Sequence, residues 1–113
     1  AGPAALNTVA ALASAKSDGD RVLLVHGEIP LAKRGQGLLQ DTTAFGCDIR
    51  HALAPVVHEQ FQIDSASDFI DQFGRLSEAM EKRRHTTHLM IGADAFSAQV
   101  PMPKRAENPA TEE

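Results

Sequence analysis

The sequence contains no tryptophan, no tyrosine and a single cysteine, Cys47, and aromatic residues make up only 4% of its 113 residues. With one cysteine the chain forms no internal disulfide, which is typical of proteins in a reducing compartment such as the cytoplasm. Phenylalanine is its only large aromatic residue, so the core must be mostly aliphatic. The lack of Tyr and Trp also disfavours single-stranded nucleic-acid binding by base stacking.

Long hydrophobic runs are absent as well. The longest are "VLLV" and "HLMIG", whereas a helix that crosses a bilayer needs about 20 apolar residues. The opening segment "AGPAALNTVAALASAKS" lacks the basic start of a secretory signal. We therefore expect neither a membrane span nor a membrane-surface role, and the sequence leaves open whether a targeting segment was removed ahead of Ala1.

What is present is an ordinary globular composition, with 42% hydrophobic and 23% charged residues and a net charge of −4. A chain of this length is long enough for one domain with its own core. We predict a single globular domain over residues 1–103, followed by a polar, disordered tail over residues 104–113. The acidic balance does not favour a general nucleic-acid binder.

The first half of the chain predicts a helix, a turn and a buried strand. Residues 4–15 are rich in alanine with a modest apolar stripe, which favours a short helix that ends near Gly19. The run "RVLLVHG", residues 21–27, is short and evenly apolar, which is typical of a buried strand. A long connection over residues 28–40 follows, with room for a short edge strand at 28–32.

The second half predicts two helices and a second strand. A helix over residues 42–60 would bury an apolar stripe, although Pro55 must kink or split it. Ser65 and Asp68 have the spacing of a capping box at the start of a helix over residues 66–84. The run "THLMIG", from residue 87, predicts another strand, and "ADAFSAQVPMPK" after it could add an edge strand.

These elements predict an α/β (or α+β) fold in the order α-β-α-α-β. We expect a two to four stranded sheet covered by a helical hairpin that turns near residues 62 and 63. A sheet of only the two clearly predicted strands would be marginally stable, and its unpaired edges could pair with a strand of another chain.

The stretch "FGCDIRHALAPVVHEQ", residues 45–60, gathers a cysteine, two histidines and two carboxylates. On a helix, Cys47 and His51 could share one ion or form a nucleophilic dyad, but His58 lies about 10 Å further along the axis, too far to join them. No third group or oxyanion hole accompanies the pair. We interpret these residues as the polar face of a helix, and predict no metal site, no cofactor and no catalytic set. His26, at the end of a buried strand, is expected to be a hydrogen-bonded residue at the edge of the core.

Basic residues at two helix ends offer another candidate site. In the expected hairpin, the connection that enters the first helix meets the end of the second, beside glycines that let a backbone approach an anion. The alternative is that the same charges complement a helix end and a solvated loop. The weak anion-binding or nucleic-acid-binding set consists of Lys33, Arg34, Gly35, Gly37, Lys82, Arg83 and Arg84.

Function follows from the incomplete sheet and the missing catalytic set. We predict a non-enzymatic interaction protein (an accessory subunit, adaptor or regulator) that docks through an open sheet edge or forms a homodimer. Its contact surface would be an edge of the first or second predicted strand, supplemented by the 28–40 connection. A phosphate-binding or nucleic-acid-binding module that uses the basic set is the alternative.

Overall fold

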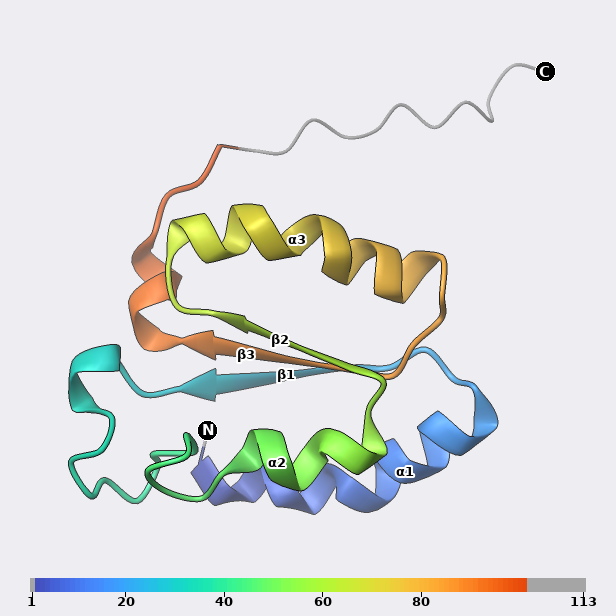
Figure 1. Cartoon of the computed structure of the whole chain (residues 1–113), viewed down its shortest axis with the longest axis horizontal. Coiled ribbons are helices and arrows are strands. Elements are labelled where there is room, and N and C mark those ends of the chain that lie inside the picture. The colour runs from blue at the N-terminus through green and yellow to red at the C-terminus, as the bar shows by residue number, and fades with distance from the viewer. Residues whose placement is uncertain (1, 102–113) are drawn as a thin grey trace.

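The computed structural model describes residues 2–101 and shows a small α/β domain with one three-stranded sheet (Figure 1). The strands lie in the order β1-β3-β2, and both neighbouring pairs are parallel. The predicted fold class and strand number are therefore confirmed. The helices are α1 (Val9–Asp18), α2 (Ile49–Leu53) and α3 (Ala66–Glu81), and the strands are β1 (Leu23–Glu28), β2 (Glu59–Ile63) and β3 (Thr87–Gly92).

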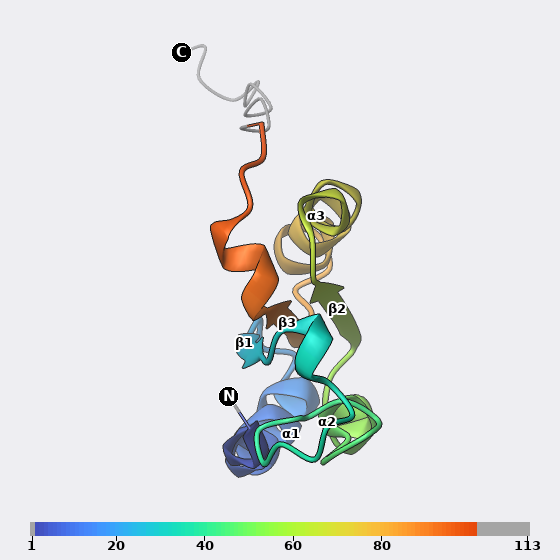
Figure 2. The same cartoon turned by 90° about the vertical axis from the view of Figure 1, so that its left-hand side faces the viewer.

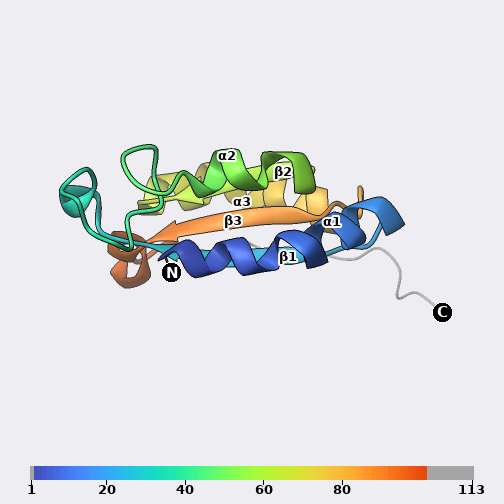
Figure 3. The ribbon, with the colours of Figure 1, turned by 90° about the horizontal axis from the view of Figure 1, so that it is seen from below.

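The helices cover both faces of the sheet. Helices α1 and α2 lie side by side against one face, α1 nearer β1 and α2 nearer β2, while α3 packs on the opposite face over β2 and β3 (Figures 2 and 3). The predicted helical hairpin does not form, because β2 follows α2 in the chain and places α3 on the other face. A parallel strand pair needs such a crossover connection.

Side-chain alternation along the strands divides the core in two. On the α3 face, Phe61, Ile63 and Leu89 pack against Leu76 and Ala79. The opposite face carries a second cluster beneath α1 and α2, made of Leu12, Ile49, Leu53 and Val57. Strand β3 is buried along nearly its whole length, as expected for the central strand of a sheet covered on both faces.

The elements predicted in the first half largely form. A 3₁₀ helix, η1 (Gly2–Thr8), leads into α1, and Gly19 ends α1 with a left-handed φ of 72°. Strand β1 starts two residues later than predicted. The edge strand suggested at 28–32 is absent, because the chain turns into the short 3₁₀ helix η2 (Leu31–Lys33).

The predicted helix over residues 42–60 is wrong. Within this segment only α2 is an α-helix. Asp48 caps it, and the Asp48 side chain accepts a hydrogen bond from the amide of His51. Pro55 lies in a 3₁₀ turn, η3 (Ala54–Val56), so it splits the segment, and β2 follows. Ahead of α2 the chain folds back on itself: the amide of Cys47 donates to the carbonyl of Asp41, and a Cβ at Gly46 would collide with that same carbonyl.

Ser65 caps α3 as predicted, whereas the return bond of the predicted capping box goes to the residue before the cap. The Ser65 hydroxyl accepts from the amide of Asp68 at 3.2 Å, and the Asp68 carboxylate accepts from the amide of Asp64 at 3.0 Å. Helix α3 ends at Glu81, three residues before the predicted end. Among the apolar residues of α3, Leu76 is buried, whereas Ile70 is exposed at the surface.

Replacing Ser65 with alanine is expected to lower the free energy of unfolding by about 1 kcal/mol, because the first turn of α3 then loses its side-chain acceptor. Urea denaturation followed by circular dichroism measures this change. Ser77→Ala, on α3 several turns after the cap, is the matched control and should change it by less than about 0.5 kcal/mol. Equal losses in both variants would contradict the cap assignment.

The end of the described chain differs from the prediction. Residues after β3 form a 3₁₀ helix, η4 (Ala93–Ser97), instead of an edge strand. The predicted tail at 104–113, like the last two residues of the predicted domain, lies outside the described residues. Within residues 2–101, none of the helices has the length and apolar character needed to traverse a bilayer.

Candidate functional site

The predicted basic set does not assemble. Lys33 and Arg34 follow β1 and therefore lie at the carboxyl ends of the strands, whereas Lys82, Arg83 and Arg84 precede β3 at the amino ends. Because all three strands run parallel, these two groups are at opposite ends of the sheet (Figure 1). The prediction that they share one patch assumed a helical hairpin that is not present.

Arg34 has a structural partner. Its guanidinium binds the Asp64 carboxylate with both terminal nitrogens, at 3.0 and 2.5 Å, and the pair is mostly buried. The arrangement lowers the pKa of Asp64 and raises that of Arg34, chiefly through their mutual hydrogen bonds. A Cβ at Gly92 would collide with the Asp64 carboxylate, so the ion pair sits directly over the end of β3. This pair joins the loop after β1 to the end of β2.

The two glycines that follow Arg34, Gly35 and Gly37, allow the chain to turn between η2 and α2. Gly35 and Gly37 both have left-handed φ values, 74° and 76°. The Gly35 amide already donates to the Asp41 carboxylate at 2.6 Å, so it is not free to bind an anion. The Asp41 carboxylate also accepts from the Thr43 hydroxyl, and these bonds lower the pKa of Asp41, the hydroxyl contributing most.

At the other end of the sheet, Arg83 pairs with carboxylates instead of standing free. It lies 3.2 Å from Glu59 and 3.3 Å from Glu78. Glu59 also accepts from the ring of His85 at 2.9 Å. The amino ends of the strands therefore carry mixed charge.

The cysteine and histidine of the 45–60 stretch have separate environments. Cys47 is half-buried against the second core cluster. The His51 ring is exposed and contacts the Asp48 carboxylate at 2.7 Å. The pKa of Asp48 is lowered chiefly by the hydrogen bond from the His51 backbone amide, with a smaller contribution from the ring. Within residues 2–101, no cluster of three or more His, Cys, Asp or Glu side chains is placed to hold a metal ion.

A buried polar network, which the sequence analysis missed apart from His26, crosses the sheet on the α1/α2 face. His26 of β1 and His88 of β3 are almost completely buried, with His26 Nδ1 3.3 Å from His88 Nε2. His88 Nδ1 contacts Gln60 Oε1 of β2 at 2.9 Å. On the other side, His26 Nε2 lies 3.2 Å from the Thr42 hydroxyl, which also binds the Glu28 carboxylate. Five side chains thus form one continuous chain of contacts.

The hydrogen bonds fix the tautomers in this network. Gln60 Nε2 donates to the carbonyl of Arg50, so Gln60 Oε1 must accept from His88 Nδ1. His88 Nε2 then accepts from His26 Nδ1, which leaves His26 Nε2 and Glu28 competing for the single proton of Thr42. With both imidazoles neutral, the contact between His26 Nε2 and the Thr42 hydroxyl lacks a proton whenever Thr42 donates to Glu28.

Burial opposes positive charge on the two imidazoles. The pKa of His88 is lowered to about 4, chiefly by desolvation, with smaller contributions from His26 and Arg50. Desolvation also lowers the pKa of His26, while the Glu28 carboxylate acts in the opposite direction. Both imidazoles are therefore neutral, hydrogen-bonded groups between the sheet and the helices at physiological pH.

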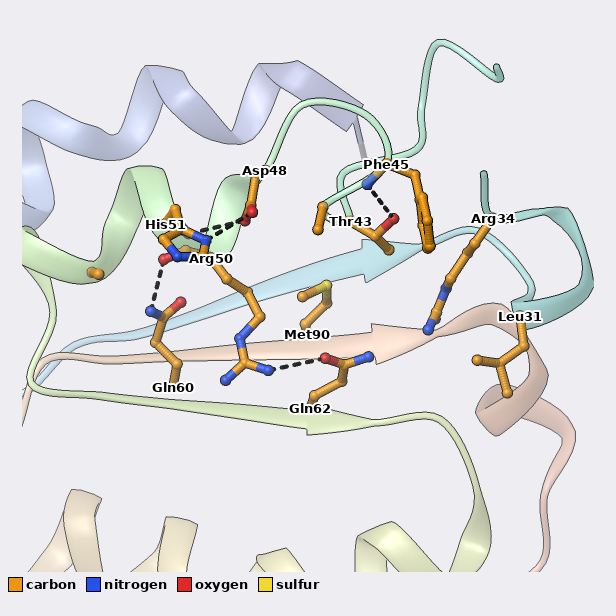
Figure 4. Close-up of a pocket in the computed structure, with 12 residues that line it drawn as sticks. Leu31, Arg34, Thr43, Phe45, Asp48, Arg50, His51, Gln60, Gln62 and Met90 are labelled. Carbon is orange, nitrogen blue, oxygen red and sulfur yellow. Dashed lines mark hydrogen bonds and ion pairs between the residues drawn. The ribbon is translucent and has the colours of Figure 1, made fainter. Parts of the chain in front are cut away.

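A pocket of about 700 Å³ opens beside this network, between α2 and the sheet. Its polar floor consists of Gln60 and Gln62 on β2, and Arg50 extends from α2 to donate to Gln62 Oε1 at 3.2 Å (Figure 4). Gln62 Nε2 in turn donates to Asp64 at 2.6 Å. Its volume is within the range of sites for small molecules.

The rest of the lining combines apolar and polar residues: Leu31, Ala44, Phe45, Ala54 and Met90 are apolar, and Arg34, Thr43, Asp48 and His51 are polar. Met90 of β3 forms the centre of the floor, and Arg34 and Arg50 lie on either side of it (Figure 4). Phe45 and Leu31 line the side formed by the loop after β1. Phe45 precedes α2, packs against Gly35 and is 79% exposed.

A second candidate surface is the outer strand β1. Its residues Leu23 and Val25 point to the α3 face, since they alternate with buried His26. Helix α3 does not cover β1, which leaves Leu23 and Val25 exposed by 37% and 54% (Figure 2). Strand β3, which the sequence offered as an alternative docking edge, is the central strand and has no free edge.

The sequence matches no protein-family model, and a search of curated proteins finds no significant match.

Proposed function

We propose that this chain is a non-enzymatic interaction protein that forms a homodimer by pairing the β1 edges of two copies. The observation that carries the proposal is that β1 is an outer strand with two exposed apolar residues, Leu23 and Val25, on the part of the α3 face that α3 leaves uncovered. An accessory, adaptor or regulatory role follows from docking of this kind. The buried histidines and the paired acids supply no assembled catalytic set.

The two edges of the sheet differ in how they are protected. Natural edge strands usually carry charge, proline or a covering element that prevents pairing. Strand β2 has such protection, with Glu59 and two glutamines along it and Arg83 paired to Glu59. Strand β1 has no proline, and its one charged residue, Glu28, is buried. The difference favours β1 as the docking edge.

Two-fold pairing makes the β1 surface complementary to itself. Suppose that two β1 strands pair in antiparallel fashion, with Leu24 of one chain opposite Leu24 of the other and both α3 helices on the same side of the joined sheet. Leu23 of each chain then lies opposite Val25 of the other. Two exposed apolar pairs are then buried next to each other. The two sheets join into one continuous sheet, and the unpaired backbone groups of both edges are satisfied.

The experiment is sedimentation equilibrium of the wild-type chain and of Val25→Lys across a concentration series. We expect a wild-type dimer and a dissociation constant that is at least about 100-fold weaker in Val25→Lys, since two lysines would lie within the joined face. Ile70→Lys is the matched control, because Ile70 is equally apolar and 59% exposed but lies on α3. This control should dimerise normally.

Hydrogen exchange tests the geometry of the same dimer. The β1 amides that do not bond to β3 should become protected as protein concentration rises, and should stay unprotected in Val25→Lys. A wild-type monomer at every accessible concentration would overturn the proposal. So would a dimer whose β1 amides gain no protection.

A further inference from the structure

We infer that the pocket between α2 and β2 binds a small molecule with a planar apolar body and one carboxylate, which Arg50 recognises. This inference is independent of the proposed dimer, since the pocket opens on the α2 side of the sheet and β1 contributes no residue to it. The ligand class follows from which polar groups of the pocket are already bonded and which are not.

Most polar groups of the pocket already have partners. Gln60 bonds to His88 and to the carbonyl of Arg50, and Gln62 bonds to Arg50 and Asp64. Arg34 is neutralised by its bidentate pair with Asp64. These groups fix the shape of the floor and leave little hydrogen-bonding capacity for a polar ligand.

Asp48, which also lines the pocket, is bonded to the amide and ring of His51, and the Thr43 hydroxyl donates to Asp41. Arg50 keeps the most donors without a partner, although its charge also acts on Asp48. One of its five N–H groups donates to Gln62, and within residues 2–101 no carboxylate lies at ion-pair distance from its guanidinium. The guanidinium extends over the floor of the pocket, with its remaining donors available (Figure 4). A planar fork of N–H donors matches a carboxylate, which accepts two parallel hydrogen bonds from it.

The apolar residues that line the pocket indicate that the main part of the ligand is apolar. Phe45, Leu31 and Met90 are apolar and surround the space next to Arg50. One face of the Phe45 ring packs on Gly35, and the ring is otherwise exposed, so it offers a surface on which a second ring can stack. A volume of about 700 Å³ accommodates one or two fused rings. Aromatic carboxylates combine both features.

The test uses 2-naphthoate and its neutral amide, 2-naphthamide, as matched probes. Titration is followed by the side-chain amide resonances of Gln60 and Gln62, which report contact with the floor directly, and by calorimetry. We expect 2-naphthoate to shift both resonances and to bind at least about tenfold more tightly than 2-naphthamide. Equal affinities for the two probes, or unchanged resonances with 2-naphthoate, would overturn the inference.

Two variants assign the preference to particular residues. Arg50→Gln should weaken 2-naphthoate at least about tenfold and leave 2-naphthamide unchanged, because it removes only the cation. Arg75→Gln, on the exposed side of α3, is the matched control and should bind both probes like wild type. Phe45→Ala should weaken 2-naphthoate more than cyclohexanecarboxylate, which lacks an aromatic face. Wild-type affinity in Arg50→Gln would refute the role of Arg50.

The dimer variant separates this inference from the proposed function. Val25→Lys should bind 2-naphthoate with wild-type affinity whether or not the chain dimerises. Loss of probe binding in Val25→Lys would contradict a pocket that is independent of β1. A monomeric wild-type chain that still binds the probe would overturn the proposed function alone.

Discussion

Replacing His88 with leucine is expected to lower the free energy of unfolding by about 2–4 kcal/mol at neutral pH. Leucine has a volume close to that of histidine, so the loss comes from hydrogen bonding and not from a large cavity. Gln60 Oε1 and His26 Nδ1 both lose their partner and stay buried. Burying unsatisfied polar groups costs more than the hydrogen bonds themselves contribute.

A double variant identifies the cause of this loss. In His26→Leu combined with His88→Leu, the two ring nitrogens that faced each other disappear together, and Thr42 keeps Glu28 as its partner. The double variant should therefore be less destabilised than the sum of the two single variants, by about 1 kcal/mol or more. Urea denaturation at fixed protein concentration measures all three. His51→Leu, which replaces an exposed ring, is the control and should change the free energy of unfolding by less than about 0.5 kcal/mol. If the effects of the two single variants simply add in the double variant, the residues do not form a connected network.

Acidification should destabilise the chain through the same histidine. The pKa of His88 falls from 6.5 in the unfolded chain to about 4 in the folded one, so between these values the unfolded chain binds more protons. The stability contributed by His88 is complete above pH 6.5 and is lost as pH falls towards 4, on the order of 3 kcal/mol in total. No carboxylate touches the His88 ring to reverse this direction; its neighbours are His26, Gln60 and Arg50.

The measurement is the unfolding free energy of the wild type and of His88→Leu between pH 7 and pH 4. The variant lacks the titrating ring, so the difference between the two proteins should shrink as pH falls. Asp64 and Asp41 have lowered pKa values and lose their contribution only at still lower pH, so they do not obscure this window. A difference that stays constant with pH would show that His88 does not titrate in this way.

Local signals predicted those elements that depend on nearby residues. Gly19 ends α1, Ser65 begins α3 through Asp68, and the runs at 21–27 and 87–92 form the two strands that were expected. Each of these depends on contacts within a few residues or on a purely apolar run. That is the range over which a sequence pattern is informative.

The segment from 42 to 60 was misinterpreted because its apolar residues fit two periods. Ile49, Leu53 and Val57 are buried as a helical stripe would require, yet the helix ends at Leu53. The alternation of "EQFQI" at 59–63 was the missed signal for β2, since Phe61 and Ile63 face the core. Pro55, which was expected either to kink or to split this helix, lies in the 3₁₀ turn between α2 and β2 and splits the segment.

The candidate sites depended on that same segment. With β2 in place, α2 and α3 separate to opposite faces, and the basic residues that a hairpin would have joined lie at opposite ends of the sheet. The polar network could not be derived from single residues, because its members come from all three strands and a loop. His26 and His88 are 62 positions apart and meet only in the folded sheet.

The ion pair between Arg34 and Asp64, 30 positions apart, restricts how this sequence can diverge. Gly92 lies directly beneath the pair, where a Cβ would meet the Asp64 carboxylate and stand 3.1 Å from the Arg34 guanidinium. A lineage that lost either charge would release the constraint on position 92, whereas one that acquired a side chain at 92 would have to give up the pair. Positions 34, 64 and 92 are therefore expected to vary together among descendants of this chain.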